Sequence, residues 1–215
     1  CSDALPEWKT DGRASITIAQ LLSLTSGITG GTFGRVPTYA DAISVRAEAA
    51  PGVSFAYGPI PFQIFGEIVR RKLLAAGRTD PDPLAYLQSR VLSPLGITPQ
   101  RWRRDRDGNP HLPSGAALTA RQWARFGQFV LDAARRTPRA GDPRLDHAAM
   151  MACFRPTSAN PGYGLTWWLP ARGLIGPGRR SGVAEDMAGL NSLGRIWLAA
   201  GAGNQRLYLL PDRDL

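Results

Sequence analysis

A tyrosine-bearing loop that runs directly into a long apolar pattern constrains this chain more than any other feature. The loop covers residues 51–59 and carries Tyr57 near its end. Apolar residues then recur at helical spacing, which predicts a helix over residues 61–76 that ends at Gly77. A phenol where a surface loop meets a rigid helix can face a cleft, and catalytic groups are common in such loops.

Two further helix starts can be predicted from paired polar residues. Thr17 with Gln20, and Thr119 with Gln122, have the spacing of a capping box, in which the two side chains satisfy each other's backbone amides. The first of these helices is expected to end near Gly27, because glycine readily adopts a left-handed cap. The second helix carries apolar residues at helical spacing and should bury one face.

Single capping residues predict two more helices. Thr38 should begin a short helix that runs through Ile43. Asp82 precedes Pro83, an N-cap followed by proline at the first helical position, and Gly96 lies just beyond the expected end. The first two thirds of the chain is therefore mainly helical.

The pattern changes after Asn160. Apolar and polar residues alternate over 163–169, as in a half-buried strand. Residues 195–200 and 206–210 are two further strand candidates, and the glycine-rich segment between them predicts a hairpin. The segment 173–189 is rich in glycine and arginine, which is typical of a loop.

The formal net charge of +9 comes almost entirely from arginine, since Lys9 and Lys72 are the only lysines. Residues 70–72 fall at the end of a helix, where cations complement the helix dipole, and residues 102–106 fall in a polar loop. No nucleic-acid-binding module or basic stripe is recognisable, so no nucleic-acid partner is expected, and an arginine-rich nucleic-acid binder is only a distant alternative. No apolar run is long enough to span a bilayer.

Two cysteines, Cys1 and Cys153, are too few and too far apart for a disulfide framework or a C-x-x-C metal clamp. Cys153 is expected to be a small buried residue. The sequence also lacks a phosphate loop, a G-x-S-x-G elbow and an H-E-x-x-H zinc helix. No metal or organic cofactor is implied, and His111 is expected in a loop.

Three phrases in order resemble the β-lactamase-related serine hydrolases: ITIAQLLSLTSGI at 16–28, PGVSFAYGP at 51–59 and PSGAALTAR at 113–121. That family includes class C β-lactamases, D-alanyl-D-alanine carboxypeptidases, esterases and 6-aminohexanoate-oligomer hydrolases. The resemblance implies an α+β fold, in which helices flank an antiparallel sheet. It also implies one partial domain over 1–215, incomplete at both ends, with a mainly helical lobe over 1–150 and sheet strands over 160–215.

The family's nucleophile is a serine activated by the lysine of an S-x-x-K helix turn, and this sequence contains no S-x-x-K. In relatives the motif precedes the phrase that resembles residues 5–8. The natural interpretation is a fragment that is inactive as given, and a pseudoenzyme that has lost its nucleophile is the alternative. The compartment cannot be read from the sequence, although the resemblance favours a bacterial periplasmic or secreted location over a cytoplasmic one.

By resemblance, Tyr57 matches the tyrosine of the family's Y-x-N motif, which moves a proton between the serine and the leaving group. The alternative is a turn tyrosine with its hydroxyl in water. Pro59 replaces the family's asparagine and has no side-chain amide, so substrate contact there should differ. Gly201, Ala202 and Gly203 occupy the place of the family's K-T-G motif and could supply an oxyanion-hole amide, or they could form only a hairpin turn.

The resemblance therefore implies a serine hydrolase that acts by acyl transfer on a small-molecule ester, amide or β-lactam when full length. The alternative is a noncatalytic binding or scaffold protein of the same fold. The sequence names neither the acyl substrate nor the oligomeric state.

Overall fold

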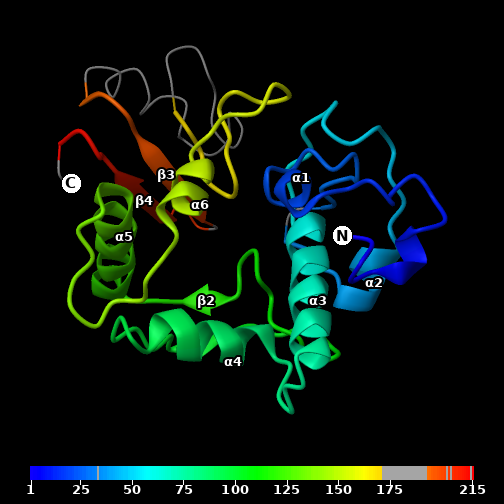
Figure 1. Ribbon diagram of the computed structural model, residues 1–215, viewed down its shortest axis with the longest axis horizontal. Helices are drawn as coiled ribbons and strands as arrows, with labels where there is room; N and C mark the ends of the chain where they lie inside the picture. Colours follow the sequence, from blue (N-terminus) through cyan, green and yellow to red (C-terminus); the bar gives the residue numbers. More distant parts are fainter. Residues whose placement is uncertain (33, 171–192, 202, 204, 214) are drawn as a thin grey trace. The chain divides into compact units, whose positions relative to one another are not determined.

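The computed structural model describes residues 1–32, 34–170, 193–201, 203, 205–213 and 215 (Figure 1). Contacts within the chain group it into two compact units. The first unit consists of Cys1–Arg90 with Pro99–Ala117, and the second of Val91–Thr98 with Leu118–Leu215. Each unit is described by itself. The expected single domain over 1–215 stays a prediction.

The first unit is built mainly from helices. Its longest helix, α3, lies against both α1 and α2 (Figure 1). A two-stranded antiparallel sheet pairs β1 with β2, with Trp102 opposite Ala116. The elements of this unit are η1 (Pro6–Trp8), α1 (Ile18–Leu22), α2 (Tyr39–Ser44), α3 (Ile60–Ala75), α4 (Pro83–Leu87), β1 (Arg101–Trp102) and β2 (Ala116–Ala117).

The helix starts are where the capping residues predict them. The Thr17 hydroxyl accepts from the Gln20 amide and the Gln20 side chain accepts from the Thr17 amide, which confirms the capping box of α1. The N-caps Thr38 of α2 and Asp82 of α4 are confirmed in the same way. Beyond Leu87 the chain continues as a five-residue π-helix, η2 (Gln88–Leu92).

The predicted end of α1 near Gly27 is wrong. The helix stops at Leu22, and Leu24 adopts a φ of 61°, in the left-handed region that few non-glycine residues occupy. Gly27 also has a positive φ, but its role lies elsewhere. A Cβ at Gly27 would lie 2.0 Å from the Ala49 carbonyl oxygen, so glycine lets two distant segments pass closely.

The core of the first unit gathers apolar side chains from the N-terminal segment, α1, α2 and α3. Each large aliphatic side chain that is fully removed from water contributes about 1.5–3 kcal/mol to folding. The buried Tyr39 packs against α3, where a Cβ at Gly66 would lie 2.3 Å from its hydroxyl oxygen. The core residues are Leu5, Trp8, Ile16, Leu21, Ile28, Ala42, Ile60, Ile64 and Ile68.

The expectation of a polar loop around Trp102 is only partly right. Trp102 belongs to β1, and its indole Nε1 donates to the His111 carbonyl at 2.9 Å. Arg104 and Arg106 do lie outside the strands, and each is paired with an acidic residue. Arg104 contacts Asp82 and Arg106 contacts Asp41, so these arginines connect neighbouring segments.

The second unit places helix α5 (Ala120–Arg135) against strand β4 (Gln205–Leu209). The capping box of Thr119 and Gln122 at the start of α5 is confirmed. Gly127 lets the helix approach the strand closely, since a Cβ there would lie 2.9 Å from a Leu209 methyl group. A shorter helix, α6 (His147–Ala152), follows in the chain.

The predicted C-terminal hairpin is confirmed. Strand β3 (Trp197–Gly201) pairs antiparallel with β4, with Trp197 opposite Leu209 and Gly201 opposite Gln205. Phe154 stacks on Trp197, with ring centroids 3.6 Å apart and ring planes 5° from parallel. The predicted loop over 173–189 lies outside the described residues.

The predicted strand over 163–169 is wrong. Tyr163 forms an antiparallel bridge with Trp168, so the chain reverses direction between these two residues. Thr166, in the reversal, has a φ of 66°, which an extended strand does not contain. Trp168 also exchanges two backbone hydrogen bonds of 2.9 Å with Leu198, and so it extends the hairpin by one bridge.

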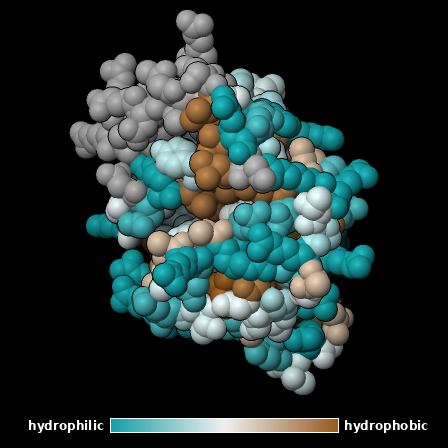
Figure 2. All heavy atoms as spheres, turned by 90° about the vertical axis from the view of Figure 1, so that its left-hand side faces the viewer, coloured by the Kyte–Doolittle hydropathy of each residue, from teal (hydrophilic) through white to brown (hydrophobic). Residues whose placement is uncertain are grey.

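Figure 2 colours the residues by hydropathy, and most of the described residues visible in it are hydrophilic, with hydrophobic residues among them. Among the described residues, no helix combines the length and apolar character that crossing a bilayer requires.

Candidate functional site

Tyr57 lies where the sequence predicts it, in a loop that leads into α3. Its side chain is partly exposed, and the helix begins three residues later at Ile60. The ring lies near that of Phe55, with centroids 6.3 Å apart and planes at 30°. The phenol is therefore not enclosed in the apolar core, unlike that of Tyr39, whose side chain is 2% exposed.

Backbone hydrogen bonds hold the tyrosine loop against the segment that follows α1. The Gly52 amide donates to the Thr25 carbonyl at 2.7 Å, and the Ala56 amide donates to the Leu24 carbonyl at 2.9 Å. These bonds join segments about 30 residues apart in the chain, and they flank the residues just before Tyr57. The loop is thus fixed by main-chain contacts on its N-terminal side.

Pro59 supports the start of α3. It occupies the N-cap position with helical backbone angles, and its side chain is buried. Proline suits the beginning of a helix because its ring fixes φ near the helical value. No side chain caps this helix, but the Ile60 amide donates to the Gly30 carbonyl at 3.2 Å.

The glycines proposed for substrate binding lie in the β3–β4 hairpin. Gly201 is the last residue of β3 and is exposed, and Gly203 has a φ of 70°. The Gly201 carbonyl accepts from Arg206 Nη1 at 3.3 Å. Ala202 lies outside the described residues. Strands β3 and β4 pair up to Gly201 and Gln205, on either side of this segment, and both its role as an oxyanion hole and the simple-turn alternative stay predictions.

The two parts of the predicted site belong to different units. Tyr57 is in the first unit, and Gly201 and Gly203 are in the second. Tyr57 has the backbone setting that the sequence predicts, a loop before a helix, and Gly201 is the last residue of β3. Their joint action on one substrate stays a prediction.

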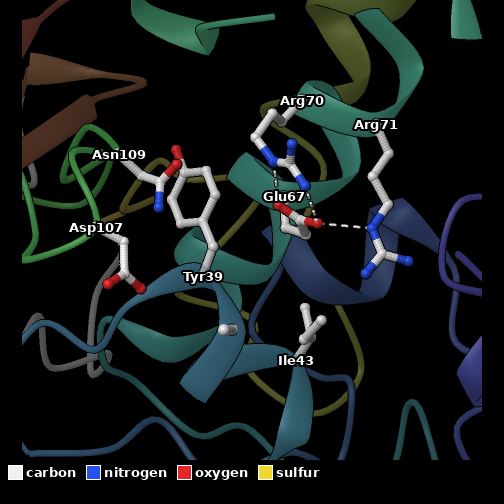
Figure 3. Close-up of a pocket in the computed structure, with 8 residues that line it drawn as sticks. Tyr39, Ile43, Glu67, Arg70, Arg71, Asp107 and Asn109 are labelled. Carbon is white, nitrogen blue, oxygen red and sulfur yellow. Dashed lines mark hydrogen bonds and ion pairs between the residues drawn. The ribbon is translucent and has the colours of Figure 1, made fainter. Parts of the chain in front are cut away.

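A pocket of about 350 Å³ opens in the first unit (Figure 3). None of the residues predicted for catalysis or binding lines it. In Figure 3 the side chains of Glu67, Arg70 and Arg71 converge along one side of the view, while Tyr39, Asp107 and Asn109 occupy the other. The lining residues are Tyr39, Ala40, Ile43, Glu67, Arg70, Arg71, Asp107 and Asn109.

Glu67 is the electrostatic centre of this pocket. Its side chain is 5% exposed, and its carboxylate accepts from Arg70 Nε at 2.7 Å and Arg71 Nε at 2.6 Å. Burial raises the pKa of Glu67, but the hydrogen bonds from Arg70 and Arg71 outweigh it, so the net pKa is lowered. Glu67 therefore stays ionised at neutral pH and is unsuited to take up a proton.

Arg71 extends this network to the N-terminal segment. Its Nη2 contacts a Glu7 carboxylate oxygen at 2.8 Å, and its Nη1 donates to the Ala4 carbonyl at 3.2 Å. The sequence pattern assigns Arg70 and Arg71 to the helix end as partners of its dipole. In the structure they are partners of Glu67, which the i, i+3 and i, i+4 spacing on α3 could have indicated.

Other titratable groups in the described part of the chain lie apart from this network. Among the residues that the structure describes, no three His, Cys, Asp or Glu side chains are grouped so that they could hold a metal ion. His111 lies in a loop, as expected. Burial lowers its pKa, and its buried Nδ1 has no hydrogen-bond partner in the described part of the chain. Cys153 is half-buried, and burial raises the pKa of its thiol.

Solved structures share the fold of this chain. A candidate beta-lactamase from Bacteroides dorei DSM 17855 matches with a TM-score of 0.66 and 20% identity, over 99% of this chain and 66% of that one. A class C beta-lactamase matches with a TM-score of 0.62 and 12% identity, over 99% and 66%. A candidate 6-aminohexanoate-dimer hydrolase from Bacillus anthracis matches with a TM-score of 0.62 and 16% identity, over 98% and 56%.

These similarities define a β-lactamase/transpeptidase-like fold, which confirms the predicted α+β class. The chain spans between about half and two thirds of the length of these structures. The sequence model of the family described as Beta-lactamase matches residues 2–215, and the chain belongs to that family. No curated protein matches the chain.

Proposed function

We propose that the protein containing this chain is a serine hydrolase that acts by acyl transfer on a small-molecule ester or amide. The observation that carries the proposal is the setting of Tyr57. In a chain of the Beta-lactamase family, this partly exposed phenol stands at the end of an anchored loop, immediately before α3. A proton-transfer group needs such a setting, because it must reach the substrate and hold its position.

In the proposed reaction, a serine oxygen attacks the substrate carbonyl and its proton passes to the leaving group through Tyr57. The bond to the leaving group breaks and an acyl-enzyme remains, which water then hydrolyses. Backbone amides of Gly201, Ala202 or Gly203 would stabilise the charge on the carbonyl oxygen. These 215 residues contain no S-x-x-K, so the sequence lacks the serine and lysine of the motif on which the reaction depends. By itself, the chain is expected to be inactive.

Pro59 affects which substrates this mechanism can accept. It is buried at the start of α3 and has no polar side-chain atom. A substrate amide or carboxylate near Tyr57 therefore has to be bound by other residues than the one at position 59. This favours simple esters and amides over substrates that depend on an asparagine side chain at that corner.

The absence of S-x-x-K from the sequence keeps a second function open, that of a noncatalytic binding protein of the same fold. A fluorophosphonate that labels nucleophilic serines distinguishes the two when applied to the natural protein that contains this chain. Labelling, together with hydrolysis of a p-nitrophenyl ester, supports the hydrolase. Absence of both supports the binding protein.

Tyr57→Phe tests the role of the phenol in the same natural protein. Turnover of the ester should fall by about 10²-fold or more, since a positioned acid or base contributes about 10²–10⁴-fold. The matched control is Tyr86→Phe, because the Tyr86 side chain is 39% exposed on α4 and lies outside the tyrosine loop. Unchanged turnover in Tyr57→Phe would remove this residue from the mechanism.

A further inference from the structure

Two glycines from distant parts of the chain touch at the tyrosine loop. A Cβ added to Gly30 would lie 2.2 Å from the Tyr57 carbonyl oxygen and 2.4 Å from the Tyr57 carbonyl carbon. A Cβ added to Gly58 would lie 2.1 Å from the Gly30 carbonyl oxygen. Such distances are far below van der Waals contact, so neither position has room for any side chain.

Conformation does not explain these glycines. Neither Gly30 nor Gly58 has a positive φ, so a residue with a side chain could adopt either backbone conformation. The neighbours that a Cβ at Gly30 would meet are backbone atoms of Tyr57 and Gly58, which cannot turn away as the end of a flexible side chain can. The requirement for glycine at these two positions is therefore steric, and it concerns the backbone of the tyrosine itself.

Backbone hydrogen bonds flank the contact between Gly30 and the Tyr57–Gly58 peptide on both sides. Before Tyr57, the Ala56 amide donates to the Leu24 carbonyl at 2.9 Å, and after it, the Ile60 amide donates to the Gly30 carbonyl at 3.2 Å. Residues 24 and 30 thus hold residues 56 and 60, and the glycine contact lies between these two bonds. The direction of the Tyr57 Cα–Cβ bond is set by a segment that precedes it by about 30 residues.

We propose that Gly30 is a positioning residue for the Tyr57 phenol. The inference rests on the proposed function, because it assigns the glycine contact to the reaction in which Tyr57 moves a proton. An alanine at position 30 would have to displace the Tyr57 carbonyl by about 1 Å to restore ordinary contact, and a shift of about 1 Å at a catalytic group can lower a rate by about 10²-fold.

The first measurement uses the 215-residue chain and needs no activity. Tyrosine rings labelled with ¹³C report the surroundings of each phenol by NMR, and Tyr57→Phe identifies the Tyr57 resonance by its loss. Gly30→Ala should move the Tyr57 ring resonance. The control is Gly12→Ala, because Gly12 lies in the same unit, has no positive φ, and has nothing within 4 Å of the position that an added Cβ would take.

The second measurement uses the natural protein that contains the chain. Gly30→Ala should lower kcat for a p-nitrophenyl ester by about 10²-fold, counted per serine that fluorophosphonate labels, and KM should change much less. Counting labelled sites removes any loss that comes only from unfolded protein. A KM change as large as the kcat change would indicate a binding role and would overturn the proposal.

The two proposals can fail separately. If Tyr57→Phe leaves turnover unchanged, the proposed function fails, whatever the resonances show. If Tyr57→Phe lowers turnover but Gly30→Ala leaves both kcat and the Tyr57 resonance unchanged, the positioning role of Gly30 fails and the function stands. If Gly30→Ala does not fold, amide hydrogen exchange in the wild-type protein tests whether the tyrosine loop is anchored. Slow exchange at Ala56 and Ile60 supports the anchoring, and exchange as fast as in an unstructured peptide contradicts it.

Discussion

Replacing Glu67 with glutamine tests the ion-pair network on α3 that Figure 3 shows. Glu67→Gln keeps the size of the side chain but removes its charge and places an NH₂ group among the arginine donors. In the wild type, the carboxylate accepts from Arg70 at 2.7 and 2.8 Å and from Arg71 at 2.6 Å. The variant leaves at least one of these donors without an acceptor.

The loss of stability in Glu67→Gln depends on how well the Arg70 and Arg71 guanidinium groups can be rehydrated. Removing one partner of a fully buried ion pair costs about 3–5 kcal/mol. Here the Arg70 and Arg71 side chains are 34% and 28% exposed, and Arg71 keeps its contact with Glu7. Because both guanidinium groups can be partly rehydrated, we expect a loss of about 2 kcal/mol, within the range for hydrogen bonds to charged groups.

The pH dependence of stability provides a second test of the same ion-pair network. Burial opposes ionisation of Glu67, but the hydrogen bonds from Arg70 and Arg71 prevail and lower its pKa in the folded state. A lowered folded pKa means that the stabilisation is complete above the unfolded pKa, which is about 4.3 for glutamate. It is lost as the pH falls through the folded pKa. The difference between wild type and Glu67→Gln should therefore shrink below about pH 4.

Amide hydrogen exchange along α3 measures this effect in the first unit alone, without assuming that both units unfold together. The control is Glu48→Gln, which removes a carboxylate from an exposed position. It should change the free energy of opening by less than about 0.5 kcal/mol. The reasoning is refuted if Glu67→Gln matches this control, or if the difference from wild type grows on acidification.

Two further substitutions test packing and capping. Gly66→Ala should lower the free energy of unfolding by about 2 kcal/mol, because its Cβ would press on the Tyr39 hydroxyl, which is itself bonded to the Pro110 carbonyl. In urea unfolding, the double variant with Tyr39→Phe should recover part of this loss. Thr119→Ala should cost about 1 kcal/mol through loss of the α5 cap, whereas Thr119→Ser keeps the hydroxyl and should stay near wild type in the same assay.

Helix starts could be predicted from the sequence because a cap is a local interaction. The side chain of Thr17 or Thr119 bonds to an amide only three residues away, so the residues that decide the structure are close together in the sequence. Helix ends depended on more distant contacts. Helix α1 ends at Leu22, and two residues later Leu24 has an unusual φ and its carbonyl accepts a hydrogen bond from the Ala56 amide. No pattern around residue 24 reveals that bond.

Alternation of apolar residues was a weaker guide in the second unit. Tyr163 and Trp168 are both buried, but they belong to two arms of a chain reversal and face each other edge to face, with centroids 4.8 Å apart. A run of alternating residues fits a strand only if no residue within it turns the backbone, and Thr166 does so here. Because threonine rarely adopts a positive φ, nothing in the residue pattern indicates the reversal.

In the candidate site, too, local residues could be predicted from the sequence, whereas distant contacts could not. The sequence places Tyr57 in a loop before a helix, because the helical pattern after it is local. The Tyr57 backbone lies in close contact with Gly30, and a glycine that lacks a positive φ looks like any other loop glycine in a sequence. Neither Gly30 nor Gly58 has room for a side chain, because a Cβ at either position would overlap backbone atoms of the other segment. Paired glycines in two segments of one unit are therefore the signal to seek when a catalytic residue is expected in a loop, and here that signal lay in the TSGITGG phrase, most of which already carried the family resemblance.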